Sequence, residues 1–320
     1  MQSTATDPPH GMMLYLVVVI LGMLVPIQTA ANARLRMRVQ SVWVATLLSF
    51  SVSTLALLVA SVAAGETLLP GEEQSDAVPW WSWGGGVIAL LTITAYIYLF
   101  RALGTLQATI LPIVGQLVFS LLIDHFGLFH AAWVALTPAR MLAVCLLLAG
   151  TALAVGRAAS RGADENAPGR SALRTVALQM LGIVTGCLLA CMGAIYGALG
   201  KALGSATQAA LCSFAIATAV MLLCCSLVGI AGRARFAFVG RNPWWMWLGG
   251  VVGAVAVFGN AWIIPQIGAG AFFMLLLIGQ MWLSVCMEWR GWMGALRRRI
   301  TCMQCLGLLL MLLGVAIIRL

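Results

Sequence analysis

The sequence predicts an all-α integral membrane protein with ten transmembrane helices, arranged as two inverted repeats of five helices each. Three observations lead to this prediction. The chain of 320 residues is 62% hydrophobic and only 8% charged, whereas a soluble domain carries roughly a quarter charged residues. Apolar runs near the length that crosses a bilayer core recur along the whole chain. A shift of 164 positions superimposes one half of the sequence on the other.

The apolar runs give the expected order of the helices. A first set lies at roughly 12–31, 42–64, 80–100, 104–123 and 138–156, and a second set at roughly 175–199, 205–230, 245–264, 268–287 and 301–318. The stretch between the sets is rich in Arg, Ala, Gly and acidic residues, which is typical of a solvated linker. We therefore expect a short tail at 1–11, repeat 1 at 12–156, a linker at 157–174 and repeat 2 at 175–320.

The two sets match at one constant shift without a gap. The matching positions include Ser49-Phe50 with Ser213-Phe214, Thr54 with Thr218, Trp80-Trp81 with Trp244-Trp245, Gly115-Gln116 with Gly279-Gln280, and Asp124 with Glu288. Chance similarity between apolar helices pairs Leu with Leu, but it does not pair tryptophans, a Gly-Gln dipeptide and an acid at the same offset. The chain is therefore an internal duplication.

An odd number of helices per repeat predicts that the second repeat enters the membrane from the opposite side. The distribution of basic residues is an independent test of this prediction. Fifteen of the eighteen Lys and Arg residues lie in the linker or in alternate short connections, and only Arg140, Lys201 and Arg319 fall on the other side. By the positive-inside rule, the connections rich in arginine and the linker are cytoplasmic, and both termini are periplasmic.

Composition and motifs exclude several classes of protein. The net charge is +9, but the arginines sit in short connections between apolar runs. This is a topology signal and not the basic groove of a nucleic-acid-binding protein, so no nucleic acid is expected as a partner. The sequence contains no P-loop, H-E-x-x-H or G-x-S-x-G motif and no dense His/Cys cluster. We therefore expect no enzymatic activity, no cofactor and no metal.

Two acidic residues, Asp124 and Glu288, lie at the ends of predicted spans and are repeat equivalents. Each ends a stripe of polar residues spaced four apart, formed by Gln116 and Ser120 in repeat 1 and by Gln280 and Ser284 in repeat 2. Inverted repeats would place one acid near each mouth of the protein. Acids at membrane depth are usually functional, which makes both residues candidates for coupling or gating. The alternative is that both acids only cap helix ends at the membrane interface.

Five further polar side chains inside the predicted spans are candidate substrate-binding residues: Gln116, Gln280, Asn32, Asn260 and Tyr96. An amide within a membrane needs a partner in the protein or a wet cavity. A tyrosine ring can form the wall of a site for an apolar or cationic ligand. Asn32 and Asn260 correspond to Tyr196 and Tyr96 in the other repeat, and a substrate site tolerates such asymmetry. Hydrogen bonds between helices, and aromatic packing, are the alternative explanation.

Three motifs recur in the same order in both halves. They are an S-F pair in the second span, W-W-x-W-x-G-G at the start of the third, and G-Q-x-x-x-S-x-x-x-[DE] in the fourth. This combination resembles the YdcZ-type family of the drug/metabolite transporter superfamily, and the copy from Trp80 to Gly127 is the more similar of the two. The resemblance implies a fused version of a five-helix unit, a bacterial inner-membrane location and a ten-helix bundle around a central cavity. Departures in the second copy, where His125-Phe126 becomes Trp289-Arg290, weaken the expectation of a symmetric cycle.

The leading hypothesis is a secondary transporter that exports a small metabolite or toxic organic compound by alternating access, coupled to protons. Its partners would be a small-molecule solute, protons and the lipid bilayer, and the protein would be a monomer or a homodimer. One alternative is a non-transporting membrane scaffold or an accessory subunit of an envelope system. Another is a membrane-embedded enzyme or a lipid scramblase.

Overall fold

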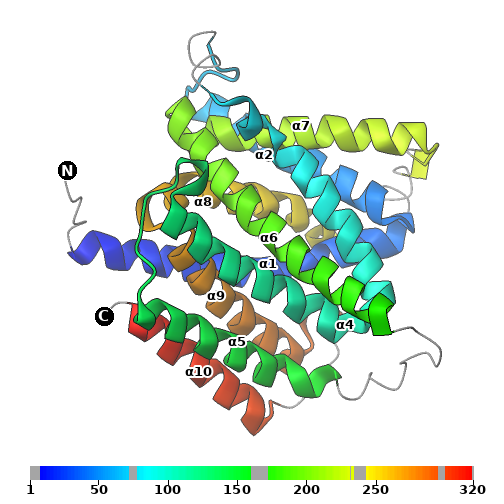
Figure 1. Cartoon of the computed structure of the whole chain (residues 1–320). Coiled ribbons are helices and arrows are strands. Elements are labelled where there is room, and N and C mark those ends of the chain that lie inside the picture. Colours follow the sequence, from blue (N-terminus) through cyan, green and yellow to red (C-terminus); the bar gives the residue numbers. More distant parts are fainter. Residues whose placement is uncertain are drawn as a thin grey trace.

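The computed structural model describes residues 8–71, 78–159, 172–230, 232–233, 243–294 and 300–318, and these residues form helices and connections without a strand. The helices (Figure 1) are α1 (Pro8–Val39), α2 (Val42–Ala63), α4 (Gly85–Phe126), α5 (Pro138–Ala159), α6 (Ala172–Leu203), α7 (Ala206–Leu227), α8 (Leu248–Ile267), α9 (Ala269–Arg290) and α10 (Cys302–Ile318). Four short 3-10 turns accompany them: η1 (Trp80–Gly84), η2 (Leu128–His130), η4 (Trp244–Trp247) and η5 (Trp292–Gly294). Most of the predicted linker at 157–174 and of the predicted tail at 1–11 lies outside the described residues.

The helices have the lengths and apolar composition of membrane spans. Among the described residues, seven helices are long and apolar enough to cross a membrane, and two shorter apolar helices lie at Pro138–Leu153 and Cys302–Ile317. The prediction of an all-α integral membrane protein with two sets of helices is confirmed.

Helix α4 contains both the third and the fourth predicted spans. A straight helix of its 42 residues would be about 63 Å long at 1.5 Å per residue. Its two ends nevertheless lie close together. The ring of Trp81, just before α4, is 5.4 Å from the ring of Phe129, just after it. The helix therefore doubles back, and in Figure 1 its cyan first part and blue-green second part run in different directions. With α4 supplying two spans, the chain has ten.

The equivalent point in repeat 2 is a true break between two helices. Helix α8 contains Pro265 in its last turn, and Gly268 separates it from α9 with φ 83° and ψ 158°. A positive φ is accessible to glycine at little cost and is strained for other residues. Both repeats therefore have a third and a fourth span, but in repeat 1 the two are joined without such a break, because helical geometry continues through Gly104, the equivalent of Gly268.

Contacts between the two repeats occur in pairs, and each pair is related by exchanging repeat 1 with repeat 2. A Cβ added to Gly115 of α4 would collide with the carbonyl oxygen of Ile183 on α6, and a Cβ on Gly279 of α9 would collide with that of Val19 on α1. Moving each residue by 164 positions converts the first contact into the second. The same exchange relates Gly186 and Pro112 to Gly22 and Leu276, and Gly150 and Gly307 to Gly314 and Ala143. Small residues at such crossings let helix backbones approach closely.

A pseudo-twofold axis therefore relates the repeats, and it passes between α2 and α7. Thr54 Oγ1 on α2 lies 3.0 Å from Thr218 Oγ1 on α7, and the rings of Phe50 and Phe214 are 5.4 Å apart in an edge-to-face arrangement. Both pairs are repeat equivalents. Because each repeat has five spans, this axis lies in the membrane plane, which is the geometry of inverted repeats.

The connections after α2 and α7 tie this central pair together at both of its ends. At one end Ser205 Oγ donates to Glu66 Oε2 at 2.8 Å, and Gln208 Nε2 donates to the carbonyl oxygen of Thr67 at 3.1 Å. At the other end Arg233 Nη1 donates to the carbonyl oxygen of Gln40 at 3.2 Å. Helices α2 and α7 are thus held at the centre and at each membrane face.

Candidate functional site

The one acidic residue classed as buried among the described residues is Asp124, in the last turn of α4. Its side chain is fully buried, with 0% exposure. Its Oδ1 accepts a hydrogen bond from the backbone N–H of Ala269 at 2.7 Å, and its Oδ2 accepts one from Gly270 at 2.9 Å. The first N–H groups of a helix have no partner within the helix, and the helix dipole favours a negative charge there. Asp124 of repeat 1 therefore caps α9 of repeat 2.

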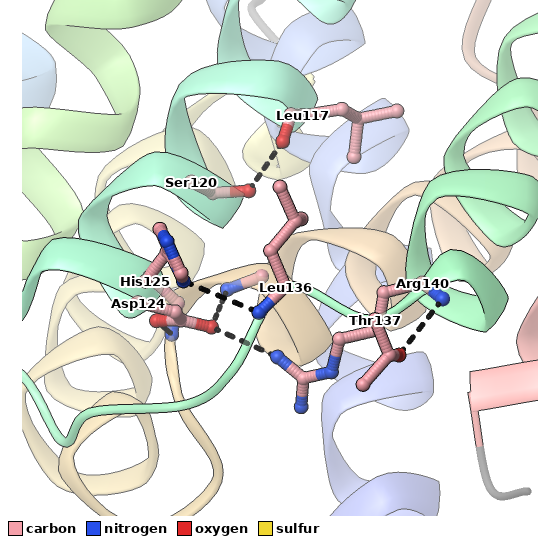
Figure 2. Close-up of polar contacts among 9 residues, drawn as sticks. Leu117, Ser120, Asp124, His125, Leu136, Thr137 and Arg140 are labelled. Carbon is pink, nitrogen blue, oxygen red and sulfur yellow. Dashed lines mark hydrogen bonds and ion pairs between the residues drawn. The ribbon is translucent and has the colours of Figure 1, made fainter.

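A cation and an ordered connection complete this arrangement (Figure 2). Arg140 on α5 places Nη1 3.8 Å from Asp124 Oδ2, with 17% of its side chain exposed. The chain between α4 and α5 folds back over the site, because Val134 donates its N–H to the Asp124 carbonyl oxygen at 2.9 Å. His125 Nδ1 accepts the N–H of Leu136 at 3.3 Å. We call Asp124, Arg140 and the N–H groups of Ala269 and Gly270 the latch, and the membrane face on which it lies the latch face.

Two glycines at the start of α9 leave room for the Asp124 carboxylate. A Cβ on Gly268 or on Gly270 would lie 2.8 or 2.9 Å from Asp124 Oδ2. Any side chain at either position would therefore push the carboxylate away from the helix end. The Gly268-Ala269-Gly270 sequence is what allows an acid from another repeat to reach these N–H groups.

Glu288 is the repeat equivalent of Asp124, but its surroundings differ. It lies nineteen residues beyond Ala269 on α9, which is about 29 Å along the helix, so the two acids lie at opposite membrane faces. Glu288 Oε2 is buried and has no hydrogen-bond partner among the described residues. The position equivalent to Arg140 is Gln304, a neutral side chain whose Oε1 accepts the N–H of Thr301 at 3.0 Å.

The predicted polar stripe on α4 is only partly available to a ligand. Ser120 is fully buried, and its hydroxyl donates to the Leu117 carbonyl oxygen of its own helix at 2.8 Å. Gln116 and Gln280 are half-buried, one residue beyond the glycines at the two helix crossings. Neither amide has a hydrogen bond with a described residue.

Asn32 and Asn260 each carry a buried carbonyl oxygen without a hydrogen-bond partner among the described residues. Asn32 Oδ1 lies against Gly249 at the start of α8, and Asn260 Oδ1 lies against Gly193 of α6. Asn260 Nδ2 donates to the Ala256 carbonyl oxygen of its own helix at 2.8 Å. Eleven residues of α8 separate the levels of Gly249 and Asn260, about 16 Å along the helix. The two asparagines therefore do not form one contact cluster, and the half-buried Tyr96 is the repeat equivalent of Asn260.

Comparison with known proteins places the chain in a family. The family model described as "Putative inner membrane exporter, YdcZ" matches residues 13–153 and 177–317. The chain belongs to the YdcZ family. It is therefore an inner-membrane protein of a transporter family and not of an enzyme family. Each match lies within one of the two repeats predicted from the sequence.

A crystal structure of another protein, 14% identical in sequence, superimposes on this YdcZ-family chain with a TM-score of 0.63. The alignment covers 96% of this chain and 97% of the other. At this identity the similarity shows the fold alone. No curated protein matches the chain.

Sequence reasoning missed the partners of the acid in this YdcZ-family protein. The sequence showed Arg140 only as one of three basic residues on the predicted periplasmic side. It showed Gly268-Ala269-Gly270 only as the start of a predicted span. A glycine on each side of the first helical residue was an available signal for a close approach. A contact between two equivalent residues, such as Thr54 and Thr218, could also have been expected, because a twofold axis must pass near some pair of equivalent residues.

Proposed function

We propose that this YdcZ-family protein is a secondary transporter that exports a small organic solute by alternating access, with protons as the coupling ion. The observation that carries the proposal is the exchange of contacts between the repeats, together with a latch that the described residues form at one face and not at the other. Inverted repeats allow two arrangements of the same contacts, one open to each side of the membrane. In this conformation α4 and α9 are latched by Asp124, whereas the equivalent acid Glu288 has no described partner.

The proposed motion uses α2 and α7 as the fixed element. These helices are joined by Thr54 and Thr218 at the centre and by Glu66 and Ser205 at the latch face. The α4 and α9 ends would move about this pair, and release of Asp124 from the N-terminus of α9 would open the latch face. Two discrete arrangements of packed helices are how such transitions ordinarily occur.

The solute would contact polar side chains within the spans, four of which have a side-chain oxygen or amide without a described partner outside their own helix. Asn32 Oδ1 and Asn260 Oδ1 are acceptors without a described partner, and the Gln116 and Gln280 amides offer both donors and acceptors. With Tyr96, these residues are the proposed substrate-binding set. Because Asn32 and Asn260 lie at different levels, the solute would meet them at successive stages of its passage.

The orientation in the membrane follows from the arginines. Arg34, Arg36, Arg38, Arg233 and Arg290 all lie on the face opposite the latch, where the positive-inside rule places the cytoplasm. The latch face and both termini would then be periplasmic. The protein would act in the inner membrane as a monomer or a homodimer.

Transport in proteoliposomes tests the proposal. A thermal-shift screen of the purified protein against metabolites and toxic organic compounds selects solutes that bind, and flux of these solutes is then followed under an imposed pH gradient. Protein-dependent flux that rises with the gradient is the expected result. If solutes that raise the melting temperature are bound but not moved, the protein is a non-transporting membrane component instead.

A further inference from the structure

The two equivalent acids differ in every partner that the structure describes. Asp124 is fully buried and accepts two N–H groups, at 2.7 and 2.9 Å, beside a guanidinium. Glu288 is only half-buried as a residue, yet its Oε2 is buried and has no hydrogen-bond partner among the described residues. Among the described residues, one acid therefore has hydrogen-bond partners and the other has none for its buried oxygen.

The loss of a cation next to Glu288 can be traced to one substitution between the repeats. Arg140 and Gln304 are repeat equivalents, and each follows a threonine by three residues. The Arg140 N–H bonds Thr137 Oγ1 at 3.3 Å, and the Gln304 N–H bonds Thr301 Oγ1 at the same distance. The backbone is thus alike at both sites, but the charge is absent from the second. The side-chain amide oxygen of Gln304 already accepts a hydrogen bond from the N–H of Thr301.

Other charged groups near this end of α9 are also engaged or exposed. Arg290 places its guanidinium 4.9 Å from the ring centre of Trp292 and 5.6 Å from that of Trp289. The remaining charged or titratable residues at this face, on the described parts of helices packed against α9, are Arg34, Arg36 and Arg38 on α1, Cys302 and Cys305 on α10, and Arg174 on α6. Within the part of the chain that the structure describes, neither these residues nor Arg290 forms an ion pair with Glu288. The side chains of Arg101 on α4 and Arg157 on α5, at the same face, are not described by the structure, nor are those of α4 at 104–107, which are equivalent to the start of α9.

A buried carboxylate oxygen without a described partner is unfavourable while it is charged. Binding a proton removes that charge, whereas Asp124 would lose two charge-assisted hydrogen bonds on protonation. We propose that Glu288 is the carboxylate that binds and releases the coupling proton, and that Asp124 is a structural latch, engaged by two N–H groups and Arg140. The only bond that forms and breaks is the O–H bond of Glu288, and the proton comes from and returns to water. This proposal rests on the transport function proposed above.

Labelling with dicyclohexylcarbodiimide tests the proposal without a transported solute. This apolar reagent reacts with protonated carboxylic acids in apolar surroundings and leaves a stable N-acylurea. The full chain in liposomes is treated over a range of pH and mapped by mass spectrometry. We expect modification of Glu288 that declines as the pH rises, and at least about tenfold less on Asp124. The Glu288→Gln variant should lose the modified peptide, whereas Asp124→Asn should keep it.

Equal or greater modification of Asp124 would overturn the proposal, as would a wild-type Glu288 that stays unmodified at every pH. The labelling is measured on wild-type protein, so it does not depend on the folding of either variant. Absence of solute flux from wild-type vesicles would contradict the transport function alone. Flux without Glu288 labelling would contradict the proton-binding role alone.

Discussion

The hydroxyl oxygens of Thr54 and Thr218 lie 3.0 Å apart although 164 residues separate them, so this hydrogen bond joins a residue to its own repeat equivalent. Thr54 Oγ1 also lies 2.9 Å from the Phe50 carbonyl oxygen, to which it donates. A hydroxyl has one proton to donate. Either hydroxyl can be the donor between the helices, and Thr218 supplies the proton whenever Thr54 donates to Phe50. The pair lies where α2 meets α7, on the pseudo-twofold axis.

The first prediction concerns this central hydrogen bond. Thr218→Val and Thr54→Val each remove one hydroxyl of the pair at nearly constant volume. Each should lower the free energy of unfolding, and a double-mutant cycle should give a coupling of about 0.6 kcal/mol, the average for such bonds between membrane helices. The measurement is unfolding of the two single variants and the double variant in micelles. Strict additivity of the two changes would show that the bond contributes nothing.

The second prediction concerns the glycine crossings. Gly22→Ala and Gly186→Ala each place a methyl group against a backbone carbonyl oxygen, that of Leu276 and of Pro112 respectively. Overpacking of this kind costs about 1–3 kcal/mol, and the twofold relation predicts similar losses at the two sites. Gly84→Ala is the matched control, because a Cβ there meets nothing within 4 Å. Thermal unfolding of the three variants provides the comparison. A tolerated Gly186→Ala beside a damaging Gly22→Ala would contradict the symmetry.

The third prediction separates the two acids by their effect on stability. Asp124→Asn puts an amide where two backbone N–H groups require acceptors, and loss of hydrogen bonds to a charged group costs about 1.5–3 kcal/mol each. Glu288→Gln removes no hydrogen bond from Oε2 to a described residue, so its effect should stay below about 1 kcal/mol. Denaturation of both variants at one neutral pH measures the difference. Equal losses would mean that Glu288 has a structural partner after all.

The fourth prediction concerns opening of the latch face. Leu121 lies beneath the latch, 7% exposed, and its side chain would be 3.0 Å from a Cβ on Gly270. In a background without the native cysteines, Leu121→Cys should react slowly with a water-soluble maleimide. The reaction should become at least about tenfold faster when Asp124→Asn is added. Trp133→Cys, at an exposed position on the same face, should react rapidly in both backgrounds and serves as the control. If Leu121→Cys stays protected, Asp124 does not hold this face closed.

Much of the architecture could be predicted because it depends on local composition. Roughly twenty apolar residues cross a membrane wherever they occur, and a constant offset between Trp80 and Trp244 or between Gly115 and Gly279 shows a duplication without any structure. The run from Gly85 to Phe126 was harder to predict. Nothing in the sequence near Gly104 distinguishes a helical reversal from the break that its equivalent Gly268 makes, because the difference lies in how each segment packs.

Asp124 and Glu288 separate what the sequence determined from what only the tertiary structure decided. The sequence alone determined that they are equivalent, that each ends a span and that the inverted repeats place them at opposite faces, because these facts follow from spacing and an odd number of helices. It left open whether they are caps or functional acids. The structure decided that Asp124 caps α9, a helix that begins 145 residues later, and that Arg140 but not Gln304 supplies a charge. Such partners arise from packing between distant segments, which no local pattern encodes.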